Sequence, residues 1–361
     1  MEESLQQVHP RFKFEGIHYT FDHLFEVAYS LIKEGQPYEI GLGDFLMDWI
    51  SPTDTIRVRT SGSTGAPKDL VLQKQAMVNS ALATGSYFGI KEGDSALLCL
   101  PGHFIAGRMM FIRAIVLGLE LDHVAPTSSP LDYIEKDYDF CGMVPLQLEK
   151  SLPKLGGMKT LLVGGAPLSD ELRNKAQNVE TRIFETYGMT ETCTHVAARP
   201  VNNLTEVHQN TVVPFKTLPN ITVTKDDRDC LVINAPDLLS PPVVTNDIVE
   251  LASETEFKWL GRFDNIINSG GIKLVPEQIE HKIANSIESR FFVAGIPDDK
   301  LGQKLVLVLE SDNQPEGLIN KLKGIKNLEK FEVPKEILTI PKFKESAGGK
   351  VSRKATLQGI V

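Results

Sequence analysis

The segment from Thr60 to Lys68, which reads TSGSTGAPK, holds residues whose types and spacing suit phosphate binding. Gly62 and Gly65 allow left-handed backbone angles and close approach, so successive N–H groups can converge on phosphate oxygens. Three hydroxyl side chains lie beside these glycines: those of Ser61, Ser63 and Thr64. Lys68 adds a positive charge, and the absence of a Gly-Lys-Ser/Thr ending excludes a Walker loop. A flexible linker would not need one lysine after a proline, so the segment predicts a phosphate-binding loop.

Six further motifs follow this loop along the chain. They combine glycines, which let a ligand approach the backbone, with aromatic, acidic and basic side chains. Their sequences are Gly164-Gly-Ala-Pro-Leu168, Tyr187-Gly-Met-Thr-Glu191, Thr245-Asn-Asp247, Gly261-Arg-Phe-Asp264, Ser269-Gly-Gly271 and Gly348-Gly-Lys350. Each motif alone has an ordinary structural explanation. In this order, however, the series resembles the adenylate-forming (AMP-binding) superfamily, which contains acyl- and aryl-CoA ligases, luciferases and the adenylation domains of peptide synthetases.

The resemblance implies a site for ATP and Mg²⁺. Adenine would lie against a glycine-rich wall and on the ring of Tyr187, while Asp247 would accept from both ribose hydroxyls. The residues assigned to the nucleotide are Thr60, Ser61, Gly62, Ser63, Thr64, Gly65, Lys68, Gly164, Gly165, Ala166, Pro167, Tyr187, Gly188, Asp247 and Arg262. Thr190 would hydrogen-bond phosphate, and Glu191 would hold Mg²⁺, a hard ion that prefers carboxylate and phosphate oxygens.

The resemblance also implies a catalytic lysine and a hinge. Lys350, whose alternative explanation is a basic mobile tail, would stabilise the charge that develops on the α-phosphorus. Asp264 would be the hinge about which a C-terminal domain turns. Ser269, Gly270 and Gly271 would then let the thiol of CoA approach, because they lack bulky side chains. Asn246 stands where the family usually has glycine, and asparagine tolerates the left-handed geometry of such a turn.

The implied reaction has two steps. A carboxylate attacks the α-phosphate of MgATP to give acyl-AMP and pyrophosphate, and the acyl group then passes to CoA, mainly through positioning and electrostatics. The continuation Thr192-Cys-Thr194 is most similar to the o-succinylbenzoate–CoA ligases of menaquinone biosynthesis. The residues suggested for the acid are His103, Phe104, Arg108, Thr194 and His195; Arg108 would pair with a second carboxylate. Alternatives are another aryl or acyl acid, a carrier protein as acceptor, and a non-catalytic nucleotide-binding relative.

Hydrophobic patterning supplies a scaffold for these motifs. Strand-like runs alternate with helical patterns between residues 95 and 188. The strands are expected at Ala96–Leu100, Cys141–Val144, Thr160–Val163 and Arg182–Tyr187, and the helices at Ile105–Leu117, Leu146–Leu152 and Leu168–Val179. This alternation predicts an α/β fold with a wound, parallel sheet whose carboxyl edge carries the ligand-binding loops. Short apolar runs between Ile221 and Leu260 predict antiparallel strands.

A new pattern begins after residues 262–264. It predicts a helix after Pro276, a strand at Lys304–Leu309, a helix near residues 316–322 and a strand near Ile337. We therefore expect a large domain over residues 1–261, a hinge at 262–264 and a small mobile α+β domain over 265–361. The family resemblance runs from about Thr55 to the end, which predicts a compact version of the large domain. Residues 1–54, with Trp49, carry no chemistry that the sequence reveals.

Composition narrows the class of protein. The 361 residues include 38 Lys and Arg against 47 Asp and Glu, a formal net charge of −9, which provides no positive field for nucleic acid or an anionic membrane. The most apolar stretch, Phe104–Leu121, contains too many charges for a membrane span. Four cysteines without CxxC spacing predict free thiols in a reducing compartment, and Cys193 is expected to be a packed residue and not a nucleophile. We expect a cytoplasmic enzyme acting on small molecules, with homo-oligomerisation left open.

Overall fold

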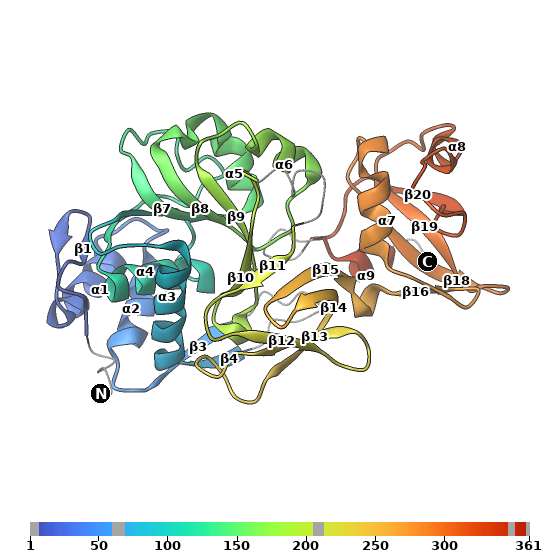
Figure 1. The fold of residues 1–361 in the computed structure, drawn as a ribbon. Helices are drawn as coiled ribbons and strands as arrows, with labels where there is room; N and C mark the ends of the chain where they lie inside the picture. The colour runs from blue at the N-terminus through green and yellow to red at the C-terminus, as the bar shows by residue number, and fades with distance from the viewer. Residues whose placement is uncertain (1–6, 60–68, 205–212, 346–350, 359–361) are drawn as a thin grey trace.

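The computed structural model describes residues 7–59, 69–204, 213–345 and 351–358. Within these ranges the strands form a 13-stranded sheet, a five-stranded sheet and a two-stranded hairpin. Figure 1 shows the five-stranded sheet and its helices as a lobe beside the larger one. The α/β class that the sequence predicts is confirmed.

One half of the large sheet is parallel and contains the strands that the sequence predicts. The strand order is β6-β5-β7-β8-β9, with bounds β6 Glu120–His123, β5 Ser95–Leu98, β7 Tyr138–Met143, β8 Met158–Val163 and β9 Arg182–Gly188. Every pairing between these neighbours is parallel. Because parallel strands end at one edge, the loops after β7, β8 and β9 meet there.

Helices cover both faces of the parallel half. One face carries α1 Leu24–Lys33, α2 Ile40–Ile50, α3 Lys74–Phe88 and α4 Ile105–Leu117, and the other carries α5 Pro145–Ser151 and α6 Asp170–Ala176. Alternate residues of β5 and the residue that follows it divide between the two cores: Ala96 and Leu98 join the core of α1 to α4, whereas Leu97 and Cys99 join that of α5 and α6. A strand buried on both faces reads as a continuous apolar run, which explains why the sequence revealed it.

The N-terminal region contains elements that the sequence did not predict. These are β1 Lys13–Phe14, β2 Ile17–His18, η1 Phe21–His23, α1, α2 and β3 Thr55–Arg59, which pairs with β4 Asp69–Gln73. β1 joins the large sheet parallel to β6. Phe45 and Trp49 of α2 are buried in the core with α4, so Trp49 serves packing.

The other half of the large sheet is antiparallel. From β9 the order continues β10-β11-β15-β14-β13-β12, with bounds β10 His195–Pro200, β11 Phe215–Thr217, β12 Thr222–Lys225, β13 Cys230–Asn234, β14 Val243–Ser253 and β15 Glu256–Arg262. All these pairings are antiparallel, which confirms the prediction for residues 221–260.

The second sheet begins after the short helix η5 Phe263–Asn265. Its strands are β16 Ile267–Ser269, β17 Ile272–Leu274, β18 Phe291–Asp298, β19 Gly302–Glu310 and β20 Glu336–Ile340, accompanied by α7 Pro276–Ile283, η6 Ala284–Ser286, α8 Leu318–Lys323 and α9 Arg353–Leu357. The predicted α7, β19, α8 and β20 are present, whereas β18 was not predicted. The break between the sheets falls at the predicted hinge; the division into two mobile domains stays a prediction.

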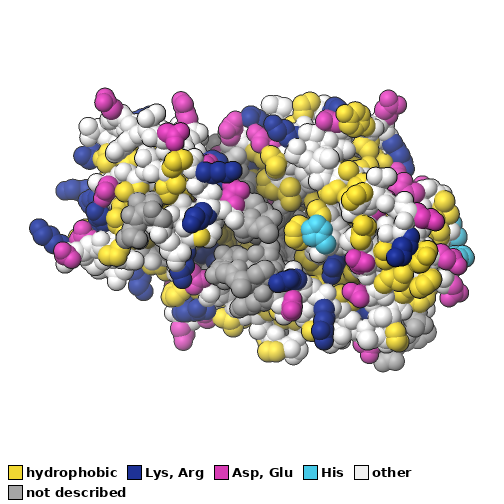
Figure 2. Space-filling view, turned by 180° about the vertical axis from the view of Figure 1, so that it is seen from behind, with side chains coloured by type: hydrophobic (Ala, Val, Ile, Leu, Met, Phe, Trp, Pro, Cys, Tyr) yellow, Lys and Arg dark blue, Asp and Glu magenta, His cyan; other side chains and the backbone are white. Residues whose placement is uncertain are grey.

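The surface shows no segregation of charge on the face seen in Figure 2, where acidic, basic and hydrophobic side chains are interspersed. None of the helices in the described part of the chain is both long enough and apolar enough to span a membrane. All four cysteines are buried free thiols, as predicted.

Candidate active site

The loop after β8 lies at the carboxyl edge of the parallel strands. A Cβ on Gly164 would lie 2.4 Å from Thr186 Oγ1 of the neighbouring β9, so a larger residue would displace this hydroxyl from its hydrogen bond to Val163 O. Gly165 has a φ of +87°, a region that favours glycine. Gly165, Ala166 and Pro167 are exposed. The loop therefore presents a surface almost free of side chains, against which a planar base can lie.

A buried carboxylate anchors the end of this loop. Glu185 accepts hydrogen bonds from Leu168 N–H at 3.2 Å and from Arg199 Nε at 2.7 Å, and it also pairs with Arg173 of α6. Burial alone would raise the pKa of Glu185, but the charges of Arg199 and Arg173 outweigh burial and lower it. Glu185 was not among the residues predicted from the sequence, although an acidic residue within a buried strand is itself a signal of a paired charge.

Tyr187 and Asp247, which belong to separate motifs, are in direct contact. Tyr187 donates its hydroxyl to Asp247 Oδ2 at 2.6 Å. Trp259 Nε1 and Arg262 Nη1 donate to Asp247 Oδ1 at 3.1 and 3.3 Å. Burial, followed by the Asp247 charge, raises the pKa of Tyr187 well above its ordinary value, so the hydroxyl remains a donor.

These contacts orient Asp247 without saturating it. A carboxylate offers about four acceptor positions, and three donors occupy Asp247. Arg262 makes the longest of the three contacts and its side chain is 30% exposed, whereas that of Asp247 is 8% exposed. A ribose hydroxyl therefore has a free acceptor position and one donor that it can displace.

The turn η3 Thr190–Thr192 presents the residues predicted to contact phosphate and Mg²⁺. Buried Thr192 closes the turn, because its Oγ1 lies within hydrogen-bond distance of Met189 N, Met189 O and Thr194 O. Cys193 then adopts a φ of +63°, a conformation that costs a residue with a side chain about 1–3 kcal/mol. Such strain often occurs where the geometry of a turn serves a site.

Glu191 fits a magnesium ligand. It is exposed, and no hydrogen bond or ion pair engages its carboxylate within the described ranges. In that same part of the chain, no three acidic, histidine or cysteine side chains surround a metal position. One carboxylate suits Mg²⁺, which commonly binds through one or two carboxylates together with substrate phosphates.

Cys193 lies beside this turn but cannot serve as a nucleophile. It is 1% exposed, as expected of a packed residue. Burial raises its pKa to about 12, so it is a thiol at neutral pH, and the reactive form of cysteine is the thiolate.

Arg113 of α4 is a functional candidate that was not predicted from the sequence. Its side chain is buried, with Nη2 at 3.2 Å from Thr194 Oγ1 and 3.4 Å from His195 Nδ1. Its Nε lies 3.4 Å from Thr84 Oγ1. No described carboxylate pairs with Arg113, and burial lowers its pKa only to about 10, so it is charged at neutral pH. The structure thus brings the predicted Thr194 and His195 together around an unpaired buried cation.

His195 supports this cation without neutralising it. Burial and then the Arg113 charge lower the pKa of His195 well below its ordinary value, so the imidazole is uncharged. Its Nε2 lies 3.3 Å from Thr84 Oγ1, leaving Nδ1 to face Arg113. A buried cation without a counter-ion costs several kcal/mol, which indicates an anionic ligand.

Arg108, the arginine chosen from the sequence, lies elsewhere on α4. It donates to Gly102 O at 3.2 Å and to Arg57 O at 3.3 Å, and its guanidinium lies 5.4 Å from the centre of the Phe45 ring. The exposed His103 and the adjoining Phe104 precede α4, with their ring centroids 4.2 Å apart. The acid-binding roles of His103, Phe104 and Arg108 stay predictions.

The predicted hinge and thiol-approach residues follow one another at the junction of the two sheets. Arg262 Nη2 lies 3.3 Å from Asp264 Oδ2. Beyond it, Gly270 and Gly271 form the turn between β16 and β17 with φ values of +61° and +84°. Nothing lies within 4 Å of where a Cβ of Gly271 would be. This open turn suits the approach of a thiol, and the roles of Ser269, Gly270 and Gly271 stay predictions.

Several predicted site residues lie outside the described part of the chain. They are Thr60, Ser61, Gly62, Ser63, Thr64, Gly65, Lys68 and Lys350. The phosphate loop joins β3 to β4, which pair from Thr55 with Gln73 to Arg59 with Asp69. Phosphate binding by this loop and catalysis by Lys350 stay predictions.

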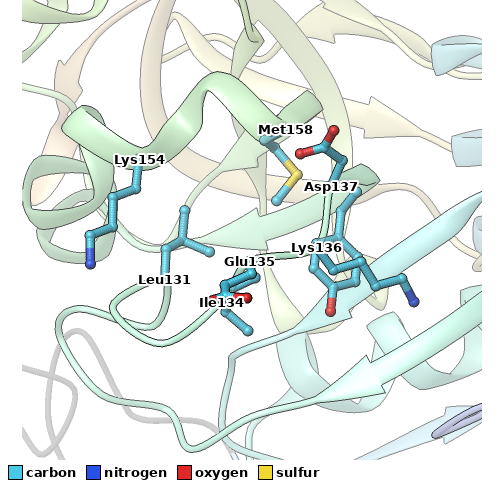
Figure 3. Close-up of a pocket in the computed structure, with 9 residues that line it drawn as sticks. Leu131, Ile134, Glu135, Lys136, Asp137, Lys154 and Met158 are labelled. Carbon is cyan, nitrogen blue, oxygen red and sulfur yellow. The ribbon is translucent and has the colours of Figure 1, made fainter.

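A small cavity of about 190 Å³ lies away from these residues (Figure 3). Its lining includes Leu131, Tyr138, Lys154 and Met158. Since Tyr138 and Met158 are the first residues of β7 and β8, the cavity lies at the amino edge of the sheet. It is therefore separate from the candidate site at the carboxyl edge.

The large wound sheet carries a glycine-rich loop at its carboxyl edge, a tyrosine–aspartate pair and an acidic turn, and a second small sheet follows it. This is the architecture of an adenylate-forming enzyme. Comparison with known proteins agrees: residues 43–229 match the profile described as AMP-binding enzyme, and the chain belongs to this family. The match begins before Thr55, so it includes part of the region that the motifs left uncovered.

Three relatives illustrate the similarity. An acyl-CoA synthetase (AMP-forming)/AMP-acid ligase II-like protein from Dyadobacter fermentans is 34% identical, with 93% of this chain and 98% of that chain covered and a TM-score of 0.61. The 2-succinylbenzoate–CoA ligase of Escherichia coli is 27% identical over 313 residues, 82% of this chain and 67% of the relative. The O-succinylbenzoate coenzyme A synthetase of Bacillus subtilis, solved with ATP and magnesium, has a TM-score of 0.71 at 20% identity, covering 83% and 69% of the two chains, and shares the fold.

Proposed function

We propose that the protein is a 2-succinylbenzoate–CoA ligase of menaquinone biosynthesis. It activates o-succinylbenzoate with ATP and Mg²⁺, forms the acyl-adenylate and releases pyrophosphate, and then transfers the acyl group to CoA. Similarity to the E. coli ligase of that name supports this assignment. We further propose that it works in the cytoplasm on these small molecules.

The buried charge of Arg113 is the observation that most supports o-succinylbenzoate as the acid. The substrate has two carboxylates: one becomes the mixed anhydride with AMP, and the other stays anionic throughout. That second carboxylate needs a cation, and Arg113 is a buried cation with no described carboxylate partner. A guanidinium also suits bidentate contact with a carboxylate. A monocarboxylic acid such as acetate would leave this charge unused.

The residues at the carboxyl edge support the first step by binding and orientation. Asp247, held by Tyr187 and Trp259, accepts from ribose, while the exposed loop after β8 receives adenine. Glu191 would hold Mg²⁺, which supplies positive charge to the phosphates when bound. Lys350 would stabilise the charge developing at the α-phosphorus. The carboxylate of the substrate is itself the nucleophile, so no protein nucleophile is required.

In the second step the thiol of CoA attacks the acyl carbon of the adenylate, and AMP leaves. The open turn at Ser269, Gly270 and Gly271 would admit the thiol because it carries little side-chain bulk. Rotation about Asp264 would bring this turn to the adenylate as Lys350 withdraws, a hinged rearrangement of a known type.

A panel of carboxylic acids tests the proposal. Pyrophosphate release is measured for o-succinylbenzoate, benzoate, succinate and acetate, with and without CoA. We expect kcat/KM for o-succinylbenzoate to exceed that for benzoate by about 100-fold, the ratio given by a charge-assisted contact of roughly 3 kcal/mol. Equal rates for all four acids would reject the named substrate. Pyrophosphate release without any thioester product would point to a different acceptor, such as a carrier protein.

A further inference from the structure

The two sheets meet without a shared hydrophobic core. Within the described ranges, every cluster of buried hydrophobic residues lies entirely before or entirely after η5. A polar contact crosses between the two parts, since His281 Nδ1 of α7 lies 3.2 Å from Asp170 Oδ2 of α6. Interfaces of this polar kind permit relative motion. Contacts at η5 itself therefore help to decide how firmly the two lobes keep the arrangement seen in Figure 1.

Besides Arg262, whose Nη2 lies 3.3 Å from Asp264 Oδ2, two further side chains of the large lobe hold the first two residues of η5. Arg228, in the turn between β12 and β13, places its guanidinium 5.1 Å from the centre of the Phe263 ring. Asn246 of β14 donates from Nδ2 to the two Asp264 carboxylate oxygens, at 3.2 and 3.4 Å. Arg228 Nη1 also donates to Asn246 Oδ1 at 2.9 Å, so the two side chains act as one unit. We call Arg228 and Asn246 the clasp.

The clasp is anchored firmly on the large lobe. Arg228 donates to Asp226 Oδ2 at 2.8 Å and to Thr245 O at 3.1 Å. Asp226 accepts in addition from the backbone N–H groups of Arg228 and Cys230, at 2.8 and 3.0 Å. The turn that carries Arg228 is therefore tied to β13 and β14 and does not depend on η5 for its shape.

The third residue of η5 is held by the small lobe instead. Asn265 Nδ2 donates to Glu277 Oε1 of α7 at 2.5 Å. Arg353 Nη2 of α9 lies 3.4 Å from the same Glu277 oxygen. The anchoring of the chain thus changes from the large lobe to the small lobe between Asp264 and Asn265.

We propose that Arg228 and Asn246 are positioning residues for the two-step reaction. Their clasp confines the pivot to the link between Asp264 and Asn265, and its strength sets the balance between adenylate formation and thioester formation. The inference rests on the proposed function, because a reaction with two lobe arrangements is what gives the pivot a role. The Arg228 and Asp264 side chains are 39% and 45% exposed, so each contact shifts an equilibrium by only about two- to five-fold, weak enough to release during turnover.

The first test measures the lobe arrangement directly in the full chain. Tyr133→Cys and Glu316→Cys place spin labels on exposed positions of the two lobes, and all four native cysteines are buried. The inter-label distances report how many molecules adopt each lobe arrangement. We expect Asn246→Ala and Arg228→Ala to lower the ratio of the most populated arrangement to all others by about two- to five-fold. Lys225→Ala is the matched control, because it removes an ion pair with Asp229 in the same turn. A distribution that changes no more in the clasp variants than in this control overturns the proposal.

The second test separates positioning from a general loss of structure. Adenylate formation is followed by pyrophosphate release, and thioester formation is followed from supplied acyl-adenylate and CoA. We expect the clasp variants to change the two rates in opposite directions, whereas structural damage lowers both. An equal fall in both rates overturns the proposal. A wild-type protein that is inactive on o-succinylbenzoate would reject the proposed function. The distance measurement needs no substrate, so in that case the effect of the clasp variants on the lobe arrangement still decides whether the clasp proposal is correct.

Discussion

At the scale of single residues, the site is built from side chains that other side chains hold in place. The Asp247 carboxylate is fixed by Tyr187, Trp259 and Arg262, with no ligand required. This pre-organisation reduces the entropy lost on binding and on reaching the reactive geometry. Arg113 differs, because its neighbours Thr194 and His195 are neutral and leave its charge available. Arg113 is therefore the residue whose replacement should most change the preference for one acid over another, because its charge has no described carboxylate partner.

Replacing Arg113 by methionine tests this role. We expect kcat/KM for o-succinylbenzoate to fall by about 10- to 100-fold, the loss of a charge-assisted contact of about 1.5–3 kcal/mol. Turnover of benzoate, which has no second carboxylate, should be unchanged. Because an apolar side chain of similar size avoids burying a charge, the free energy of unfolding should stay the same or rise. Steady-state kinetics with both acids and urea unfolding provide the measurements.

The controls for Arg113→Met come from the same helix. Arg113→Lys retains the charge but not the planar fork, so its activity should be intermediate. Arg108→Met removes the arginine suggested by the sequence, whose contacts are backbone carbonyls and the Phe45 ring, and should have the smaller effect on o-succinylbenzoate. If Arg108→Met is the more damaging change, the acid-binding role belongs to Arg108.

Lys350 gives a second prediction at the residue scale. Lys350→Ala should abolish formation of the acyl-adenylate, because the charge developing at the α-phosphorus then has no lysine to stabilise it. Thioester formation from supplied acyl-adenylate should be largely spared. Pyrophosphate release and thioester formation are assayed separately on the same preparation. Loss of both half-reactions to the same degree would reject the role assigned to this lysine.

At the scale of elements, the site depends on how closely β9 and β10 approach. Gly188 ends β9 and pairs with His195 of β10. A Cβ at this position would lie 2.3 Å from Thr194 O and 2.4 Å from His195 Cα, both of which are backbone atoms. The glycine therefore fixes the position of the segment that reaches Arg113.

Gly188→Ala tests this close approach. The added methyl group should force β10 away from β9 and lower the free energy of unfolding by about 1–3 kcal/mol, as is typical of overpacking. The KM for o-succinylbenzoate should rise as well, because Thr194 and His195 move. Gly156→Ala is the matched control, since nothing lies within 4 Å of its Cβ position. Unfolding midpoints of the two variants that shift equally would contradict the explanation.

The elements that could be predicted from the sequence are those with a clear local pattern of apolar residues, which can be recognised without knowing what they pack against. The central strands β5 and β8 are largely buried on both faces and read as nearly continuous apolar runs, and α4 was predicted with its observed bounds, Ile105–Leu117. β1 was missed because it is only two residues long and joins the large sheet through β6, which is distant in sequence. β18 was missed although its partner β19 follows directly, because Gly295 and Pro297 interrupt its apolar run. Arg113 was missed for a different reason. An arginine within an apolar helix faces either solvent or interior, and only the packed structure shows that Arg113 faces Thr84 and His195.

At the scale of the whole molecule, stability and function draw on different features. Three hydrophobic clusters stabilise the large lobe and two stabilise the small lobe among the described residues, while polar contacts hold the junction. Motion at the junction can thus occur without unfolding either core. Within the large lobe, His123 and His195 are both buried, and burial lowers the pKa of each. Buried neutral histidines make the stability of the large lobe sensitive to acid.

His123 provides the clearest case. It is 7% exposed, lies beside the Tyr38 ring, and has no hydrogen-bond partner for either ring nitrogen within the described structure. Burial lowers its pKa to about 4, below the value of about 6.5 expected in the unfolded chain. Between these two pH values the unfolded state binds a proton that the native state does not. The free energy of unfolding therefore falls as the pH falls from about 6.5 to 4, and above pH 7 His123 contributes no pH dependence.

His123→Leu removes the group that binds this proton, so the free energy of unfolding should depend less on pH in the variant. Between pH 7.5 and 5.0 we expect the wild type to lose about 2 kcal/mol more of its free energy of unfolding than the variant, as linkage between the two pKa values requires. His195 titrates in both proteins, so its contribution cancels in the comparison. Exposed His18→Leu is the matched control, and urea unfolding at the two pH values is the measurement. If the wild type and His123→Leu lose the same stability, protonation of His123 does not limit the acid stability of the large lobe.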